Sequence, residues 1–231
     1  GDEVVVPAFT YYATWLAVAQ IGAVPVPVDV ERETGNIDPL LVRSAITPKT
    51  RAIIAVSLFG QAARLNELRS TADEAGLVLI EDCAQSHGAM YQSRMSGTVG
   101  HASGFSFYPT KNLGALGDAG AVATDDPEVA ARVRSRRSYG QGESKYDHVE
   151  TGWNSRLDPL QAAFLSLHLR KLPHWTARRQ EIASMYREAL ADAPVSVVVG
   201  PSDVTNSVWH HFVLRAHDRE GLRRHLAEAR V

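Results

Sequence analysis

The feature that most constrains the fold of this chain is the alternation of short apolar runs with amphipathic helical segments. The apolar runs are typical of strands covered on both faces, and they lie at residues 4–6, 24–28, 53–58, 77–80, 102–107 and 121–123. Amphipathic segments at 10–21, 38–46 and 62–75 lie between them, and Gly76 follows the third as a helix-ending residue. This alternation predicts an α/β fold with a mostly parallel sheet, helices on both faces and right-handed crossovers.

The second half of the chain is less regular. A helix is predicted at 128–137, whereas residues 138–155 are glycine-rich, polar and too long for a connection without a function. Helices at 158–171 and 175–191, separated by Pro173, precede strands at 195–199 and 212–214 and a helix at 218–230. We therefore expect a large domain over 1–172 and the start of a small α/β domain over 173–231. The chain begins almost directly on a strand, so we expect truncation at both ends.

Composition excludes several classes of protein. The net charge of −2 does not favour a nucleic-acid binder, which normally carries a basic excess. The single cysteine, Cys83, excludes an internal disulfide and is typical of a reducing compartment. No apolar run approaches the roughly 18–20 residues of a membrane span, and no basic segment of a signal peptide precedes residue 4. We expect a cytoplasmic protein with no nucleic-acid or membrane partner.

Polar side chains follow two of the predicted strands. The segment LVLIEDCAQSHGA places Asp82 at a strand end, and ASGFSFYPTKNLGALGDAGAV places Ser106 at another, with Lys111 just beyond. In parallel sheets, ligands collect at these ends. Taken singly, Asp82 is explained by helix capping and Lys111 by solvation at the surface. Together, a carboxylate, a desolvated amine that forms Schiff bases and a hydroxyl match the ring nitrogen, aldehyde and phosphate of pyridoxal phosphate.

Four longer motifs carry a resemblance to a known family. In order they are GDEVVVPAFTYYAT, EDCAQSHGA, FSFYPTKNLGALGDAGAV and GWNSRLDPLQAA. Over its whole length the chain resembles the sugar aminotransferases of the DegT/DnrJ/EryC1/StrS group, which are pyridoxal-phosphate enzymes of fold type I. The resemblance implies that Lys111 holds the cofactor through its amine and moves the proton in transamination.

The same resemblance implies roles for further residues. Asp82 is expected at the pyridinium nitrogen, Gln85 at the ring hydroxyl and Ser106 at the phosphate. Ala84 is expected beneath the ring and Tyr11 stacked above it. Asn154 is expected to cross into the phosphate site of a neighbouring subunit, which implies a homodimer.

Other polar side chains have weaker assignments. Tyr146 and His148 lie in the loop before Asn154 and are candidates for contact with the sugar, with solvated loop residues as the alternative. His87, His210 and His211 share no metal-ligand spacing, so they are interpreted as core or surface histidines and no metal is expected.

The motifs resemble most closely the branch of dTDP-3-amino-3,6-dideoxyhexose transaminases. That branch implies transfer of an amino group from glutamate to a dTDP-linked 3-oxo-6-deoxyhexose, for amino-sugars of antibiotics or surface glycans. A 4-keto-sugar or inosose aminotransferase of the same family is the alternative. Relatives that dehydrate sugars replace the lysine by histidine, and Lys111 argues against that reaction.

A regulatory or binding protein on the same fold is the alternative of another class. It predicts loss of Lys111 or Asp82, and both are present. The family's phosphate-binding helix N-terminus is expected before Gly1, and such a terminus supplies N–H donors and a favourable dipole. We therefore expect the chain by itself to be inactive or poorly active.

Overall fold

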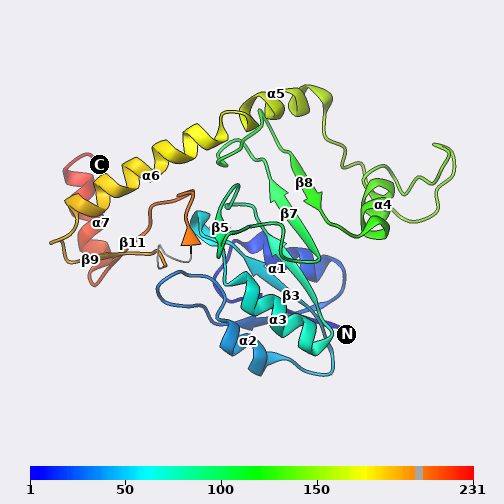
Figure 1. Cartoon of the computed structure of the whole chain (residues 1–231), viewed down its shortest axis with the longest axis horizontal. Coiled ribbons are helices and arrows are strands. Elements are labelled where there is room, and N and C mark those ends of the chain that lie inside the picture. The colour runs from blue at the N-terminus through cyan, green and yellow to red at the C-terminus, as the bar shows by residue number, and fades with distance from the viewer. Residues whose placement is uncertain (201–204) are drawn as a thin grey trace.

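The computed structural model describes residues 1–200 and 205–231 and is built around a six-stranded sheet (Figure 1). The strand order is β2-β1-β3-β4-β7-β8. The strands are β1 (Glu3–Pro7), β2 (Val24–Val28), β3 (Thr50–Val56), β4 (Val78–Asp82), β7 (Ala102–Ser106) and β8 (Gly120–Ala123). All neighbours pair in parallel except β7 and β8, which are antiparallel. The predicted α/β fold with a mostly parallel sheet is confirmed.

The helices in this part of the chain begin and end at local sequence signals. They are α1 (Tyr12–Gln20), α2 (Pro39–Ala45), α3 (Leu65–Ala75) and α4 (Pro127–Arg136). Asp38 and Asp126 accept hydrogen bonds from the first N–H groups of α2 and α4, and a proline occupies the first turn of each. Gly76 ends α3 in the left-handed conformation, with φ of 64°. The helices predicted at 10–21, 38–46, 62–75 and 128–137 are all present.

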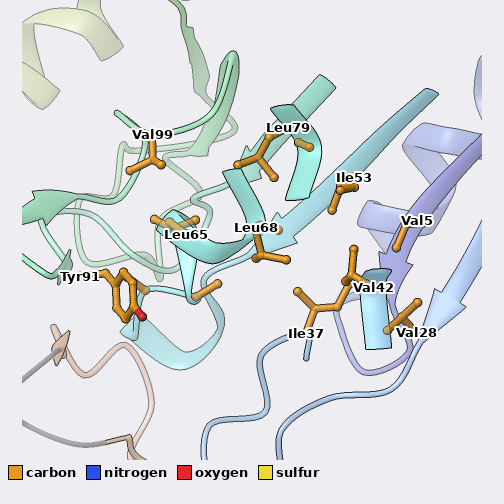
Figure 2. Packing of buried hydrophobic residues seen from close by; sticks show 14 of the residues in the cluster. Val5, Val28, Ile37, Val42, Ile53, Leu65, Leu68, Leu79, Tyr91 and Val99 are labelled. Carbon is orange, nitrogen blue, oxygen red and sulfur yellow. The ribbon is translucent and has the colours of Figure 1, made fainter. Parts of the chain in front are cut away.

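Helices cover both faces of the sheet because successive strand residues alternate between them. On one face, Val5, Ile53 and Leu79 pack with Val42 of α2 and Leu68 of α3 (Figure 2). On the other face, Val4, Val6 and Ile54 pack with Val18 of α1. Burial of both faces explains why these strands read as continuous apolar runs rather than alternating ones.

The two edge strands of the sheet differ in sequence and in exposure. β2 has the sequence VPVPV, and its Pro25 and Pro27 have no N–H group to donate. β8 has the sequence GAVA, and all four of its residues are exposed. The expectation that the run at 121–123 is covered on both faces is therefore wrong, because a cleft between β8 and α4 lies over this part of the sheet.

The rest of the chain forms two long helices and smaller β units. α5 (Pro159–Leu169) leads to α6 (Leu172–Ala189), and a ribbon of β9 (Val195–Val197) and β11 (Leu214–Ala216) packs with α7 (Arg219–Glu228). A third sheet joins β10 (Thr205–Asn206) to the hairpin of β5 (Met90–Tyr91) and β6 (Arg94–Met95). Within the described ranges, no helix combines the length and apolarity needed to cross a membrane.

Three details differ from the sequence prediction. α6 begins at Leu172 rather than at 175, since Pro173 lies in its first turn, where a missing N–H costs nothing. The strand expected at 212–214 lies at Leu214–Ala216, and the one expected at 195–199 ends at Val197. The two-residue strands β5, β6 and β10 were not expected. The domain division between residues 172 and 173 falls in the first turn of α6 and stays a prediction.

Candidate active site

A cleft of about 940 Å³ lies where β4 and β7 end. Asp82 is opposite Gly104 in the parallel register of these strands, and Ser106 follows two residues later on the same face. The cleft is accordingly lined by Asp82, Ser106 and Ala84. The expectation that the two strand ends converge on one crevice is confirmed.

The Asp82 carboxylate is held from two sides. Its Oδ2 accepts a hydrogen bond from Thr14 Oγ1 at 2.9 Å, and its Oδ1 accepts one from the Ala84 N–H at 3.1 Å. Thr10 Oγ1 lies 3.0 Å from Thr14 Oγ1, so Thr10 donates to Thr14 when Thr14 donates to the carboxylate. Our sequence analysis missed Thr14. The available signal was a pair of threonines four residues apart, at the start of the helix that follows β1.

Lys111 lies in a tight turn after β7. Its N–H donates to Tyr108 O at 2.8 Å, and the Ala115 N–H closes the loop onto Phe107 O at 2.8 Å. The turn requires Gly114, where a Cβ would overlap the Pro109 carbonyl.

The amine of Lys111 combines partial burial with a nearby negative charge. Among the described residues its Nζ forms no hydrogen bond or ion pair. Burial lowers the pKa of the amine below its usual range, and the charge of Asp82 offsets part of that effect. The structure thus brings Lys111 and Asp82 close enough to interact electrostatically. An amine with a lowered pKa is the form that a nucleophilic lysine needs.

Gln85 is oriented by the backbone of another loop. Its Oε1 accepts a hydrogen bond from the Phe59 N–H at 2.7 Å, which leaves the Nε2 group as the donor available to a ligand. Phe59 has φ of 60°, a left-handed conformation that is uncommon for a residue with a side chain. The backbone is therefore held in an unfavourable conformation at a residue that contacts the candidate site.

Glu81 occupies the opposite face of β4 from Asp82. Its side chain is fully buried and accepts three backbone hydrogen bonds, from Gly97 and Gly100 at 2.6 Å and from Val99 at 2.7 Å. Glu81 therefore fixes the loop behind β4 and has a structural role. Burial, followed by the charge of Glu81, raises the pKa of the neighbouring Cys83 to about 12, so this thiol stays protonated.

Two of the histidines belong to the interior. His87 lies between the rings of Phe105 and Phe107, with centroids 5.8 and 5.7 Å away. His210 Nδ1 lies 3.0 Å from Asn112 Oδ1. Burial lowers the pKa of His87 to about 4 and that of His210 to about 3, so both are neutral at pH 7. The interpretation of these histidines as core or surface residues is confirmed, because His87 and His210 are buried and His211 is exposed.

Four of the expected site residues are open to solvent. Tyr11 precedes α1 and is 75% exposed. Asn154, Tyr146 and His148 lie on the 138–155 loop, which extends away from the six-stranded sheet (Figure 1).

The loop residues make local contacts. Asn154 Oδ1 accepts from Arg156 Nε at 3.1 Å, and His148 Nδ1 lies 3.0 Å from Tyr139 O. Tyr146 lies under Lys145 Nζ, 4.9 Å from its ring centroid. None of these loop residues lines the cleft beside Asp82 in its own chain. Their roles at a second copy stay predictions.

Comparison with known proteins places the chain among sugar aminotransferases. It is 50% identical over its 231 residues to the erythromycin biosynthesis sensory transduction protein EryC1 of Saccharopolyspora erythraea, of which it covers 63%. It is 49% identical over 227 residues, 98% of this chain and 59% of the relative, to dTDP-3-amino-3,4,6-trideoxy-alpha-D-glucose transaminase of Streptomyces venezuelae. The crystal structure of S. venezuelae DesV in complex with a ketimine intermediate matches with a TM-score of 0.94 at 48% identity.

The DesV match covers 99% of this chain and 61% of that one. The chain spans about three fifths of the length of these relatives. The family model of the DegT/DnrJ/EryC1/StrS aminotransferases matches residues 1–231. Because that match includes every residue, this chain belongs to the DegT/DnrJ/EryC1/StrS aminotransferase family.

Proposed function

We propose that this protein is a pyridoxal-phosphate-dependent aminotransferase that moves an amino group from glutamate to a dTDP-linked 3-oxo-6-deoxyhexose. The observation that carries the proposal is the cleft at the ends of β4 and β7, which Asp82 and Ser106 line, together with a partly buried Lys111 amine whose pKa responds to the charge of Asp82. The sugar assignment is supported by the name of the S. venezuelae relative, a transaminase of a dTDP-3-amino sugar.

The residues at the cleft suit the cofactor. The carboxylate of Asp82 is fixed by Thr14 and by the Ala84 N–H, with no ion pair among the described residues, so it remains available to a protonated ring nitrogen. The Nε2 of Gln85, which forms no hydrogen bond among the described residues, would donate to the ring hydroxyl. Ser106 and Ala84 line the same cleft and are our candidates for the phosphate and for the position beneath the ring. Tyr11, which is exposed and outside that lining, is our candidate above the ring.

Bound pyridoxal phosphate supplies an aldehyde that condenses with amines and a protonated ring that withdraws electrons. Lys111 would hold the cofactor through its amine when no substrate is present and, once released from it, would move a proton at its Nζ. The two hydrogen bonds to Asp82 would orient its carboxylate toward the ring nitrogen. Burial lowers the pKa of the Lys111 amine, which favours the unprotonated form that reacts as a nucleophile.

The complete site is proposed to form in a homodimer in the cytoplasm. Asn154 is exposed and does not line the cleft of its own chain, as expected of a residue that serves a neighbour. Large apolar side chains are open to solvent near this loop, including Trp153 and Leu160, which are 60% and 72% exposed. Such residues suit a surface that a second copy covers.

A regulatory protein is the second candidate, because the relative EryC1 is named a sensory transduction protein. Regulation without catalysis would leave Lys111 with no covalent chemistry. The two candidates therefore differ in whether Lys111 reacts with the cofactor.

Borohydride trapping separates them. We expect incubation with pyridoxal phosphate to give a near-visible absorbance band, and reduction followed by peptide mapping to place the label at Lys111. Lys49, Lys145 and Lys171 are internal controls, and Lys111→Ala should remove the band while Lys171→Ala retains it. Equal labelling of all four lysines would contradict the proposal. The sugar is then assigned by presenting dTDP-3-oxo and dTDP-4-oxo sugars with glutamate and identifying the aminated carbon.

A further inference from the structure

The segment before β11, residues 208–211, is hydrogen-bonded to the loop at Phe59 and Gly60, which also contacts Gln85 of the candidate site. The Val208 N–H donates to Gly60 O at 2.8 Å, and the His211 N–H donates to Phe59 O at 3.2 Å. A Cβ at Gly60 would lie 2.6 Å from His210 N, so the two backbones meet only because residue 60 is glycine. Phe59 thus fixes His211 through its carbonyl and Gln85 through its N–H.

Backbone strain is concentrated at this contact. Phe59 has φ of 60° on one side and Trp209 has φ of 48° on the other. Neither residue is a glycine, and such conformations persist only where surrounding contacts enforce them. Residues of this kind cluster at ligand sites, and here they set the position of an exposed histidine.

The surroundings of His211 are positively charged. Burial, and then the charges of Lys111 and Arg179, lower the pKa of His211 below its usual range. Arg179 Nη1 donates to Trp209 O at 3.1 Å, and the ring of His210 lies 4.2 Å from that of His211. Within residues 1–200 and 205–231, no carboxylate forms an ion pair with Lys111, Arg179 or His211. The charge of Asp82 acts on Lys111, whereas Arg179 has no carboxylate partner among the described residues. Arg179 and the neighbouring exposed imidazole of His211 are therefore suited to an anionic ligand.

We propose that His211 and Arg179 bind the carboxylate of the amino acid that donates the amino group. The inference rests on the proposed function, in which that amine reacts next to Lys111. In an α-amino acid the carboxylate is bonded to the carbon that carries the amine, so the anion must arrive beside the reacting nitrogen. The diphosphate of a nucleotide-sugar is the other anion of the reaction, but it is attached at C1 and not at the carbon that is aminated.

The test is direct binding of 2-oxoglutarate, the keto acid of glutamate, followed through the imidazole C–H resonances of the protein by NMR. We expect 2-oxoglutarate to shift the His211 signals and His211→Ala to weaken its binding by about tenfold or more, the effect of losing a hydrogen bond to a charged group. His211→Gln retains a neutral donor and should weaken binding less. His225→Gln, at an exposed position on α7, is the matched control and should bind as the unmodified chain does.

Two further ligands identify the source of the anion. The dimethyl ester of 2-oxoglutarate lacks both charges and should leave the His211 signals unchanged, and dTDP should not displace 2-oxoglutarate. Unchanged affinity in His211→Ala, or displacement by dTDP, would overturn the inference. Absorbance with pyridoxal phosphate is recorded on the same samples. Loss of the band with binding of 2-oxoglutarate retained refutes the proposed function, whereas a normal band without a His211 shift refutes only this inference.

Discussion

The buried carboxylate of Glu81 offers a quantitative test of how this fold is held together. In Glu81→Gln the amide oxygen retains two of the three backbone donors, and the new NH₂ group faces the third. One hydrogen bond to a charged acceptor is lost, at about 1.5–3 kcal/mol, and two become neutral, at about 1 kcal/mol each. The expected loss in the free energy of unfolding is therefore about 3–5 kcal/mol.

Urea unfolding followed by tryptophan fluorescence at pH 7 measures this loss. Ser103→Ala is the matched control, because Ser103 Oγ donates to Gly97 O at 3.0 Å in the same loop and is also buried. Removing that neutral hydrogen bond should cost about 1 kcal/mol. The reasoning is wrong if Glu81→Gln is as stable as the unmodified chain, since the cost of burying the charge would then equal or exceed the benefit of its hydrogen bonds.

Three other perturbations follow from the structure. Gly60→Ala should lower the free energy of unfolding by about 3 kcal/mol or more in the same assay, because φ is +98° and the new Cβ would overlap backbone atoms. Gly76→Ala is the control: its φ is +64° but the space around it is open, so it should cost only about 1 kcal/mol. The unfolded state binds protons at His87 and His210 near pH 6.5, whereas the folded state does so only near pH 4 and 3, so stability should fall by about 2 kcal/mol per histidine between pH 7 and pH 5. His87→Phe should halve that pH dependence, and an unchanged slope would contradict the assignment. Thr14→Val should weaken binding of pyridoxal phosphate about tenfold in an absorbance titration, while Thr14→Ser retains the hydroxyl and the affinity.

Local signals account for most of the fold that the sequence predicted. Each of the six strands of the main sheet overlaps a short apolar run, although β8 is exposed, and α2 and α4 begin at an Asp-Pro pair that caps a helix on its own. The β5–β6 hairpin and β10 have no such signal. Thr205 pairs with Tyr91 across more than a hundred residues of sequence, and two-residue strands exist only because the folded chain brings them together.

The candidate site divides in the same way. The convergence of Asp82 and Ser106 was predictable, because the ends of neighbouring parallel strands meet at one edge of a sheet. The contact of Thr14 with Asp82 depends on where α1 packs after β1, and that of His211 with Phe59 depends on docking of the segment before β11. Periodicity within either segment carries no information about such contacts.

The unequal edges of the main sheet have a consequence for handling the protein. Two prolines in the edge strand β2 lack the N–H groups that a further strand would need as hydrogen-bond donors. The other edge strand, β8, contains only glycine, alanine and valine, with no charge or proline to prevent pairing. Intermolecular pairing of sheet edges is therefore expected at β8 and not at β2. Val122 is 50% exposed, so Val122→Lys would place a positive charge on β8 and disfavour pairing at this edge. The variant should then resist aggregation during storage at high concentration.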